Sequence, residues 1–267
     1  MSDFAIIIPA RYASTRYPGK PLVPLRGVHG NSKSLIQRSW ECASAVQGCA
    51  GVWVATDDER IAVEVRRFGG KVVMTSPECA NGTERCADAI LRLGHMPEII
   101  VNLQGDAPLS PSFLPERLVS RLDADPGVAM STPAVRCSRT LFEHLAADAA
   151  EGRVGGTTTV FSRTSRALYF SKRVLPYVPE GILNSEVLPV YLHLGIYAYR
   201  TSALAQYKSA AASELEVLEG LEQLRFLELG LPVSIVELEP LDWDAVELNN
   251  PSDVEVIERV LVERGID

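Results

Sequence analysis

Three cationic side chains gather in one short polar segment near the start of the chain. Arg11, Arg16 and Lys20 lie among small hydroxyl residues in the segment 9–22, and residues 4–40 contain six lysines or arginines and no acid. The whole chain has a formal net charge of −8, so this positive segment runs against the average. It indicates a ligand rich in phosphate, while a solvated basic loop is the alternative that composition leaves open.

A carboxylate follows a later apolar run. Residues 98–103 are predicted to form a core strand, and Gln104-Gly105-Asp106 comes directly after them. The glycine allows close approach of the backbone, and Mg²⁺ prefers one or two carboxylates together with phosphate oxygens and water. We therefore expect Asp106 to bind Mg²⁺. An N-cap role for the helix that begins near Pro111 is the alternative.

A third polar segment, Asn81-Gly82-Thr83-Glu84-Arg85, precedes a predicted helix. We expect Thr83 to cap this helix and Arg85 to lie in its first turn. A bound anion would gain there from both the guanidinium and the helix N-terminus. Spacing alone favours the alternative, in which Arg85 pairs with Glu84 or another surface carboxylate.

A polar stripe marks the segment 213–230, which is predicted to be one helix. At ~100° per residue, Glu216, Glu219 and Gln223 fall on one narrow face flanked by leucines. Carboxylates and amides can bind the hydroxyls of a sugar, whereas a solvated polar face is the simpler interpretation.

The elements that carry these residues alternate between strand and helix. Apolar runs at 4–8, 52–55, 72–74 and 98–103 predict strands, with helices between them, one of them capped by Ser32 or Ser34. This order is typical of a doubly wound parallel sheet, whose ligands bind at the carboxyl ends of the strands. The basic segment and Asp106 both fall at such ends. No Gly-x-Gly-x-x-Gly follows the first strand, which argues against an ordinary dinucleotide-binding domain.

Composition excludes several other classes of protein. An acidic chain without an extended basic stripe argues against a nucleic-acid partner. Five cysteines, none in a Cys-x-x-Cys pair, indicate neither a disulfide framework nor a zinc site. No apolar run approaches the ~20 residues of a membrane span, and no signal-peptide pattern opens the chain. We therefore expect a cytoplasmic protein that is not inserted in a membrane.

The segment 9–22 resembles the P-A-R-x-x-S-T-R-x-P-G-K-P-L signature of the CMP-KDO synthetases, the 3-deoxy-manno-octulosonate cytidylyltransferases. The resemblance continues through most of the chain. Residues 81–85 are similar to the family's N-G-T-E-R, 104–108 to Q-G-D-E-P, 167–171 to A-L-Y-F-S and 193–199 to H-x-G-I-Y-x-Y. Residues 215–225 reproduce L-E-x-x-E-x-L-E-Q-L-R, and residues 248–253 align with V-D-T-P-E-D.

This resemblance implies a Mg²⁺-dependent enzyme that joins CTP and 3-deoxy-manno-octulosonate (KDO) into CMP-KDO and pyrophosphate, for lipopolysaccharide or capsule synthesis. The implied catalytic residues are Arg11, Lys20 and Asp106. The implied nucleotide contacts are Ala10, Arg11, Ser14, Arg16, Lys20, Arg85 and Gln104. The implied sugar contacts are Tyr169, His193, Tyr197, Glu216, Glu219 and Gln223, and the implied metal ligands are Asp106 and Asn249.

The resemblance also implies an architecture. The expected fold is a Rossmann-like, doubly wound, mostly parallel α/β sheet of the nucleotide-diphospho-sugar transferase type, with a smaller β-rich subdomain. Residues 1–127 would form the nucleotide-binding core, 128–212 an inserted sugar-binding and dimerisation subdomain, and 213–267 a return to the core. A homodimer is expected, since the family's second subdomain often forms one.

Four departures from the family pattern keep alternatives open. Ala107 stands where the family usually has Glu, Asn249 where it has a metal-binding Asp, and Lys172 where it has Arg. The segment 27–33 is longer than the family's turn, which suggests a surface insertion or, alternatively, an extra triphosphate contact from His29 or Lys33. The acceptor could therefore be another 2-ulosonic or nonulosonic acid, or the chain could bind CTP without catalysis.

Overall fold

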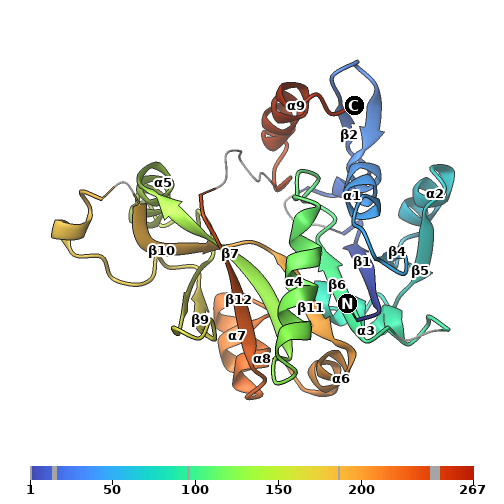
Figure 1. Ribbon diagram of the computed structural model, residues 1–267. Helices are drawn as coiled ribbons and strands as arrows, with labels where there is room; N and C mark the ends of the chain where they lie inside the picture. The colour runs from blue at the N-terminus through green and yellow to red at the C-terminus, as the bar shows by residue number, and fades with distance from the viewer. Residues whose placement is uncertain (1, 14–16, 95–96, 186, 241–246) are drawn as a thin grey trace. The chain divides into compact units, whose positions relative to one another are not determined.

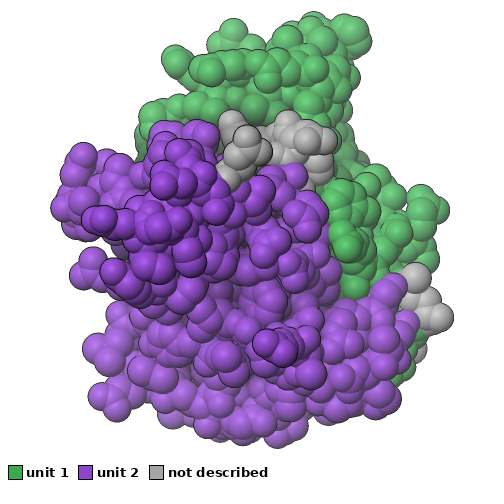
Figure 2. Space-filling view, turned by 60° about the vertical axis from the view of Figure 1, so that its left-hand side comes forward, with its two compact units in different colours: residues 1–119, 243–267 green, residues 120–242 purple. Residues whose placement is uncertain are grey.

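The computed structural model describes residues 2–13, 17–94, 97–185, 187–240 and 247–267. The chain divides into two compact units, residues 1–119 with 243–267 and residues 120–242 (Figure 2). The sequence predicted the boundaries at 128 and 213 instead. Residues 213–242 belong with the second unit, because the strand Val233–Leu238 pairs with the long strand of that unit, and residues 243–267 belong with the first.

Parallel strands in the order β5-β4-β1-β6 form the sheet of the first unit (Figure 1). Every residue of β1 and β6 is buried, as is usual for parallel strands that helices cover on both faces. The mostly parallel α/β fold predicted from the sequence is confirmed. The strands are β1 (Phe4–Ala10), β4 (Val52–Thr56), β5 (Lys71–Met74) and β6 (Ile99–Leu103).

Three helices of this unit begin at side-chain caps. Ser34 accepts a hydrogen bond from the backbone of Gln37, which confirms one of the two predicted caps for that helix. The predicted cap Thr83 is wrong, because Asn81 accepts from the backbone of Glu84 and the helix already includes Thr83. Among the described residues, no helix has both the length and the apolarity needed to cross a membrane. The helices are α1 (Leu35–Ser44), α2 (Glu59–Arg67), α3 (Gly82–Ile90) and α4 (Phe113–Ala124), the last of which continues into the second unit.

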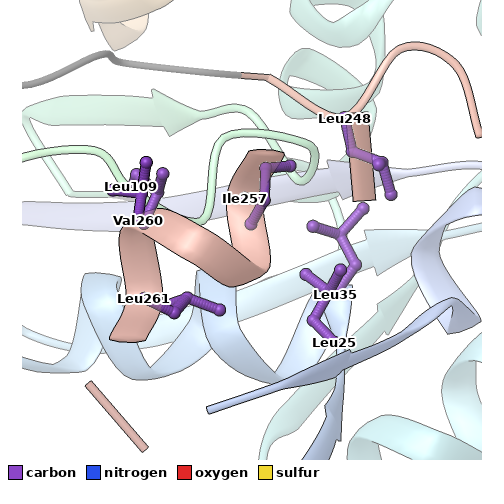
Figure 3. Packing of buried hydrophobic residues seen from close by; sticks show 7 residues of the cluster. All are labelled: Leu25, Leu35, Leu109, Leu248, Ile257, Val260 and Leu261. Atoms are coloured by element: carbon purple, nitrogen blue, oxygen red, sulfur yellow. The ribbon is translucent and has the colours of Figure 1, made fainter. Parts of the chain in front are cut away.

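The last helix, α9 (Asp253–Glu263), closes the first unit by packing on its N-terminal part. Three of its side chains pack against four buried leucines, each from a different segment that precedes α9 in the chain (Figure 3). Burial of such side chains contributes roughly 1.5–3 kcal/mol each, so this cluster joins the two ends of the described chain. Its members are Leu25, Leu35, Leu109, Leu248, Ile257, Val260 and Leu261.

The segment 27–33 lies in a small hairpin of β2 (Pro24–Arg26) and β3 (Ser32–Ser34). The Lys33 ammonium donates to Glu41 Oε2 at 3.0 Å and to the backbone oxygen of Asp267 at 2.6 Å. The backbone N–H of His29 donates to Asp267 Oδ1 at 3.2 Å. The contacts of both residues are with the chain's last residues and α1, which supports the surface-insertion interpretation.

The second unit is organised around the nine-residue strand β7 (Met130–Ser138). Strand β12 pairs with β7 in parallel along residues 130–135, while β11 and β10 pair antiparallel along its other edge. Strands β8 and β9 extend the sheet beyond β10. The remaining strands and helices are β8 (Thr158–Phe161), β9 (Ala167–Ser171), β10 (Val187–His193), β11 (Ile196–Arg200), β12 (Val233–Leu238), α5 (Arg139–Ala150) and α6 (Thr201–Ser209).

The predicted single helix 213–230 is wrong in one respect. Two short helices, α7 (Glu214–Glu219) and α8 (Leu224–Glu228), take its place. Gly220 ends α7 with a φ of 62°, a left-handed conformation that glycine adopts without the strain of a Cβ atom. Glu216 and Glu219 therefore lie on α7, whereas Gln223 lies at the start of α8, so the three residues do not share the face of one continuous helix.

Candidate active site

Glycines allow three of the predicted segments to meet beside the end of β1. A Cβ atom on Gly105 would lie 3.0 Å from the backbone oxygen of Pro9. A Cβ atom on Gly82 would lie 3.2 Å from Gln104 Nε2 and 3.3 Å from Pro9 Cγ. These close approaches bring the segments that begin at residues 81 and 104 against the strand that leads into the basic loop. The predicted meeting of polar residues at the carboxyl edge of this sheet is therefore present.

Lys20 and Asp106 form an ion pair at this edge. The distance from Lys20 Nζ to Asp106 Oδ2 is 2.6 Å, and the two side chains are 15% and 23% exposed. Gly19 precedes the lysine with a φ of 72°, and a short 3-10 turn, Lys20–Leu22, follows. A cation and a carboxylate that both remain partly exposed can be reached by an ionic ligand. Two of the three predicted catalytic residues are thus brought into contact.

The predicted metal ligands lie on adjoining segments. The N–H of Leu248 donates to the backbone oxygen of Asp106 at 2.8 Å, which places Asn249 on the segment beside Asp106. Asp253 holds this segment by accepting from the N–H groups of Asn249 at 2.8 Å and Asn250 at 2.7 Å. The Asn249 amide nitrogen faces Glu247 Oε2 at 3.5 Å.

Arg85 lies in the first turn of α3, as predicted, but it is only 3% exposed. Its Nη1 donates to Thr75 Oγ1 at 2.6 Å and lies 3.2 Å from Asp57 Oδ1. The guanidinium therefore joins the residues that follow β4 and β5. The structure shows Arg85 in contact with Thr75 and Asp57. Its contact with a nucleotide stays a prediction.

The other predicted nucleotide contacts lie in different surroundings. Ala10 is buried at the end of β1, whereas Arg11 is exposed directly after it. Ser14 and Arg16 fall outside the described residues.

In the second unit, His193 is buried against β7. Its Nε2 lies 2.8 Å from Thr132 Oγ1, and that hydroxyl also lies 2.8 Å from the backbone oxygen of Ile196. Because a hydroxyl has one proton and the carbonyl can only accept, the His193 ring donates from Nε2. Burial lowers the pKa of His193 to about 3, so the ring is neutral at physiological pH. This arrangement suits a hydrogen-bonding residue and does not supply a general base.

Tyr197 and Gln223 lie next to this histidine. The Tyr197 ring is centred 5.5 Å from the His193 ring, and its hydroxyl donates to Gln223 Oε1 at 3.4 Å. Gln223 is 2% exposed, and its Nε2 has no hydrogen-bond partner among the described residues. A buried amide N–H without a partner is unfavourable unless a ligand or water accepts from it. Three of the predicted sugar contacts therefore form one group with an N–H available to an acceptor.

Glu219 holds the strand end that carries Tyr169. Its carboxylate accepts from Ser171 Oγ at 2.7 Å, from the N–H of Lys172 at 3.0 Å and from the Tyr169 hydroxyl at 3.4 Å. Desolvation and the nearby Glu219 charge raise the pKa of Tyr169. The phenol therefore stays protonated, and able to donate, through neutral pH.

Glu216 is buried and paired away from this group. Its two oxygens accept from Arg225 Nε at 2.5 Å and Nη2 at 2.7 Å, and one of them also accepts from the Tyr207 hydroxyl at 3.1 Å. A capping box with Ser213 adds two further bonds at the start of α7. These partners favour a structural role over the predicted sugar contact, because the break at Gly220 separates Glu216 from the face that bears Gln223.

Sequence reasoning did not assign Thr132 and Arg225 to the site. Thr132 is an internal residue of β7 with no motif around it, and only the fold brings it to His193. Arg225 closes the L-E-Q-L-R run, so a signal was present, but its role as the partner of Glu216 depends on the two-helix geometry.

Comparisons with known proteins agree with this geometry. The model of the cytidylyltransferase family matches residues 5–235. A 3-deoxy-manno-octulosonate cytidylyltransferase of Maricaulis maris is 40% identical over 97% of this chain and 97% of the relative. An 8-amino-3,8-dideoxy-manno-octulosonate cytidylyltransferase of Shewanella sediminis is 39% identical over 96% of this chain and 97% of the relative.

A solved structure extends the likeness to three dimensions. The chain is similar to a CMP:2-keto-3-deoxy-manno-octonic acid synthetase complexed with CTP, with a TM-score of 0.83 and 32% identity. The match covers 98% of this chain and 100% of that one. The protein is therefore a nucleotidyltransferase that belongs to the CMP-KDO synthetase family of cytidylyltransferases.

Proposed function

We propose that the protein transfers a cytidylyl group from CTP to KDO. The anomeric oxygen of the sugar forms a bond to the α-phosphorus of CTP, the bond to the bridging oxygen of the β-phosphate breaks, and pyrophosphate leaves. The proton of the sugar hydroxyl is released to solvent. The named activity of the Maricaulis maris relative and the CTP in the similar solved structure support this reaction.

The Lys20–Asp106 pair is the observation that carries the proposal. Phosphoryl transfer of this kind depends on positioning and charge stabilisation more than on covalent chemistry by the protein. Lys20, with Arg11 and Arg16 from the same loop, would bind the β- and γ-phosphates that leave as pyrophosphate. Gln104 and Arg85 would contribute to binding the nucleotide at the same edge of the sheet.

Mg²⁺ is the cation that we propose for this site. Asp106 would hold it, with Asn249 as a second ligand through its amide oxygen. The Asp106 carboxylate faces the ammonium of Lys20 at 2.6 Å, and this contact with a cation supports the proposal. No trio of His, Cys, Asp or Glu suited to a metal exists among the described residues, which fits a cation whose other ligands are phosphate and water. Mg²⁺ would supply neutralisation of phosphate charge.

The acceptor would bind to the group around Gln223. Gln223 Nε2, which has no hydrogen-bond partner within the described part of the chain, can donate to a sugar oxygen, and Tyr197, Tyr169 and His193 offer further polar contacts. Glu219 would orient this surface through Ser171 and Lys172. The 8-amino analogue of KDO is the second candidate acceptor, because a relative named for it is nearly as similar to this chain as the one named for KDO.

Pyrophosphate release tests the proposal directly. Purified protein, Mg²⁺ and each of the four nucleoside triphosphates are combined with KDO or with 8-amino-KDO. We expect release with CTP and KDO and with no other nucleotide. Turnover confined to the amino sugar would move the assignment to the second acceptor, and CTP binding without turnover of either sugar would contradict both.

A homodimer and a cytoplasmic location complete the proposal. The family resemblance supports both. On α7, Val217 and Leu218 are 69% and 74% exposed, and a second copy of the chain would cover such apolar side chains. Light scattering after gel filtration, at twice the chain mass of 29.1 kDa, checks the dimer.

A further inference from the structure

The two ends of the basic loop are tied together at Tyr12 and Gly19. The N–H of Gly19 donates to the backbone oxygen of Tyr12 at 2.9 Å, which closes the segment 12–19. A Cβ atom on Gly19 would lie 3.1 Å from both Cζ and Oη of the Tyr12 side chain. The tyrosine ring therefore packs against the glycine backbone. Arg11 lies directly before this closure and Lys20 directly after it.

A guanidinium from α2 holds the same ring. Arg60 Cζ lies 3.3 Å from the centroid of the Tyr12 ring. The guanidinium is itself oriented by Asp58, whose two oxygens accept from Arg60 Nε at 2.9 Å and Nη2 at 2.6 Å. Asp58 also caps α2, accepting from the backbone of Arg60 at 2.9 Å. A bidentate pair fixes the plane of the guanidinium, so a rigid helix end presents a flat cation to the tyrosine.

We infer that Tyr12 and Arg60 are positioning residues of the nucleotide site. Their stack fixes the closed base of the basic loop, so Arg11 and Lys20 lose less conformational freedom when they bind a polyphosphate. Arg60 acts through Tyr12 and not through contact with the phosphates. This inference rests on the proposed use of CTP by the same loop.

Calorimetric titration with CTP tests the inference. Arg60→Ala removes an exposed cation–π contact, so the affinity for CTP should fall about two- to fivefold. Tyr12→Ala should lose about tenfold, because it removes the packing on Gly19 as well, and Tyr12→Phe should stay close to wild type because the ring remains. In turnover assays the KM for CTP should rise in R60A and Y12A, while the KM for the sugar and the melting temperature without nucleotide stay unchanged.

Two further variants separate stacking from charge. Arg66 lies on the same helix and pairs with Glu59 at 2.6 Å, so Arg66→Ala removes an equal charge without touching the stack and should bind CTP normally. Arg60→Lys keeps the charge but loses the planar fork, and should weaken binding as R60A does. Wild-type affinity in either R60A or R60K would overturn the inference alone. Failure of the wild-type protein to bind CTP would overturn the proposed function and the inference with it.

Discussion

The two units hold their predicted site residues in contrasting ways. In the first unit, Lys20 and Asp106 are an ion pair whose side chains remain 15% and 23% exposed. In the second, His193 and Gln223 are 8% and 2% exposed, and neutral hydrogen bonds hold them. The same unit also holds a buried ion pair, Glu216 with Arg225, whose side chains are 8% and 3% exposed.

This contrast suggests how each half meets its substrate. Each charge of a partly exposed pair can exchange its partner for a charged ligand at a lower cost to folding than in a fully buried pair. A buried neutral network instead fixes donors and acceptors in advance, and the buried Glu216–Arg225 pair of the same unit cannot be broken without loss of stability. Substitutions in the first unit should therefore affect the reaction, and those in the second should first affect folding.

The largest effect is expected from Glu216→Gln. The change leaves the buried Arg225 without its countercharge, and breaking a buried pair in this way costs about 3–5 kcal/mol of unfolding free energy. Urea denaturation gives the value. The exposed Glu214 begins the same helix, so Glu214→Gln is the matched control and should stay near wild type. Equal stability of E216Q and wild type would remove the contrast between the units.

Lys20→Ala should show the opposite pattern. Loss of a prepositioned cation should slow pyrophosphate release about 100-fold, equivalent to about 3 kcal/mol, while the melting temperature stays near wild type. Lys33→Ala is the control, because that ammonium contacts Glu41 and Asp267 instead. A K20A variant that turns over at the wild-type rate would show that the ion pair has no part in the reaction.

His193 should give the second unit a pH-dependent stability. Unfolded histidine binds a proton near pH 6.5, but burial lowers the pKa of folded His193 to about 3. The unfolded state therefore holds more protons between these values, and stability falls as the pH decreases from 6.5 toward 3. The contribution lost between pH 7 and pH 5 is about 2 kcal/mol.

Denaturation at several pH values measures this slope. His193→Gln should flatten it, whereas His144→Gln should retain it, since His144 is exposed on α5. An unchanged slope in H193Q would contradict the neutral buried assignment.

Gly220→Ala should have the smallest effect on stability, and it should also weaken binding of the acceptor sugar. Its φ of 62° makes a Cβ atom unfavourable by about 1 kcal/mol, and that atom would lie 2.8 Å from Lys172 Nζ. Gly230 has a φ of 70° with nothing within 4 Å, so Gly230→Ala isolates the backbone term. We expect similar unfolding free energies for the two variants but a raised KM for the sugar only in G220A. Equal KM values for the sugar in the two variants would show that the turn between α7 and α8 has no part in acceptor binding.

Sequence motifs and the spacing of apolar residues predicted much of the fold, because both depend on interactions between residues close together in the chain. The buried run of β1, the cap at Ser34 and the change to a β-rich pattern near residue 128 are all encoded within a few residues. The Lys20–Asp106 contact was implicit, since both residues follow parallel neighbouring strands.

Other features depend on contacts distant in sequence. A helical period cannot reveal that Gly220 takes a left-handed φ and ends α7, so Glu216 and Gln223 were placed on one helix although they lie in two. Arg60 carries no motif and becomes relevant only because α2 brings it over Tyr12. The compact units differ from the predicted domains for a similar reason, because β12 pairs with β7 across about a hundred residues of chain, as the register of Val233 with Met130 shows.

That pairing, together with the cluster around α9, has a consequence for synthesis on the ribosome. Leu25 and Leu35 must wait for Leu248 and Ile257 before they are covered, and one edge of β7 must wait for residues 233–238. The second unit, residues 120–242, can be completed once β12 has emerged, whereas the first unit, although its N-terminal part is made first, needs residues 248–261 and is completed last. Nascent chains stalled before residue 233 should therefore expose both the leucine cluster and the unpaired edge of β7 to chaperones, and the cluster should stay exposed until residues 248–261 have emerged.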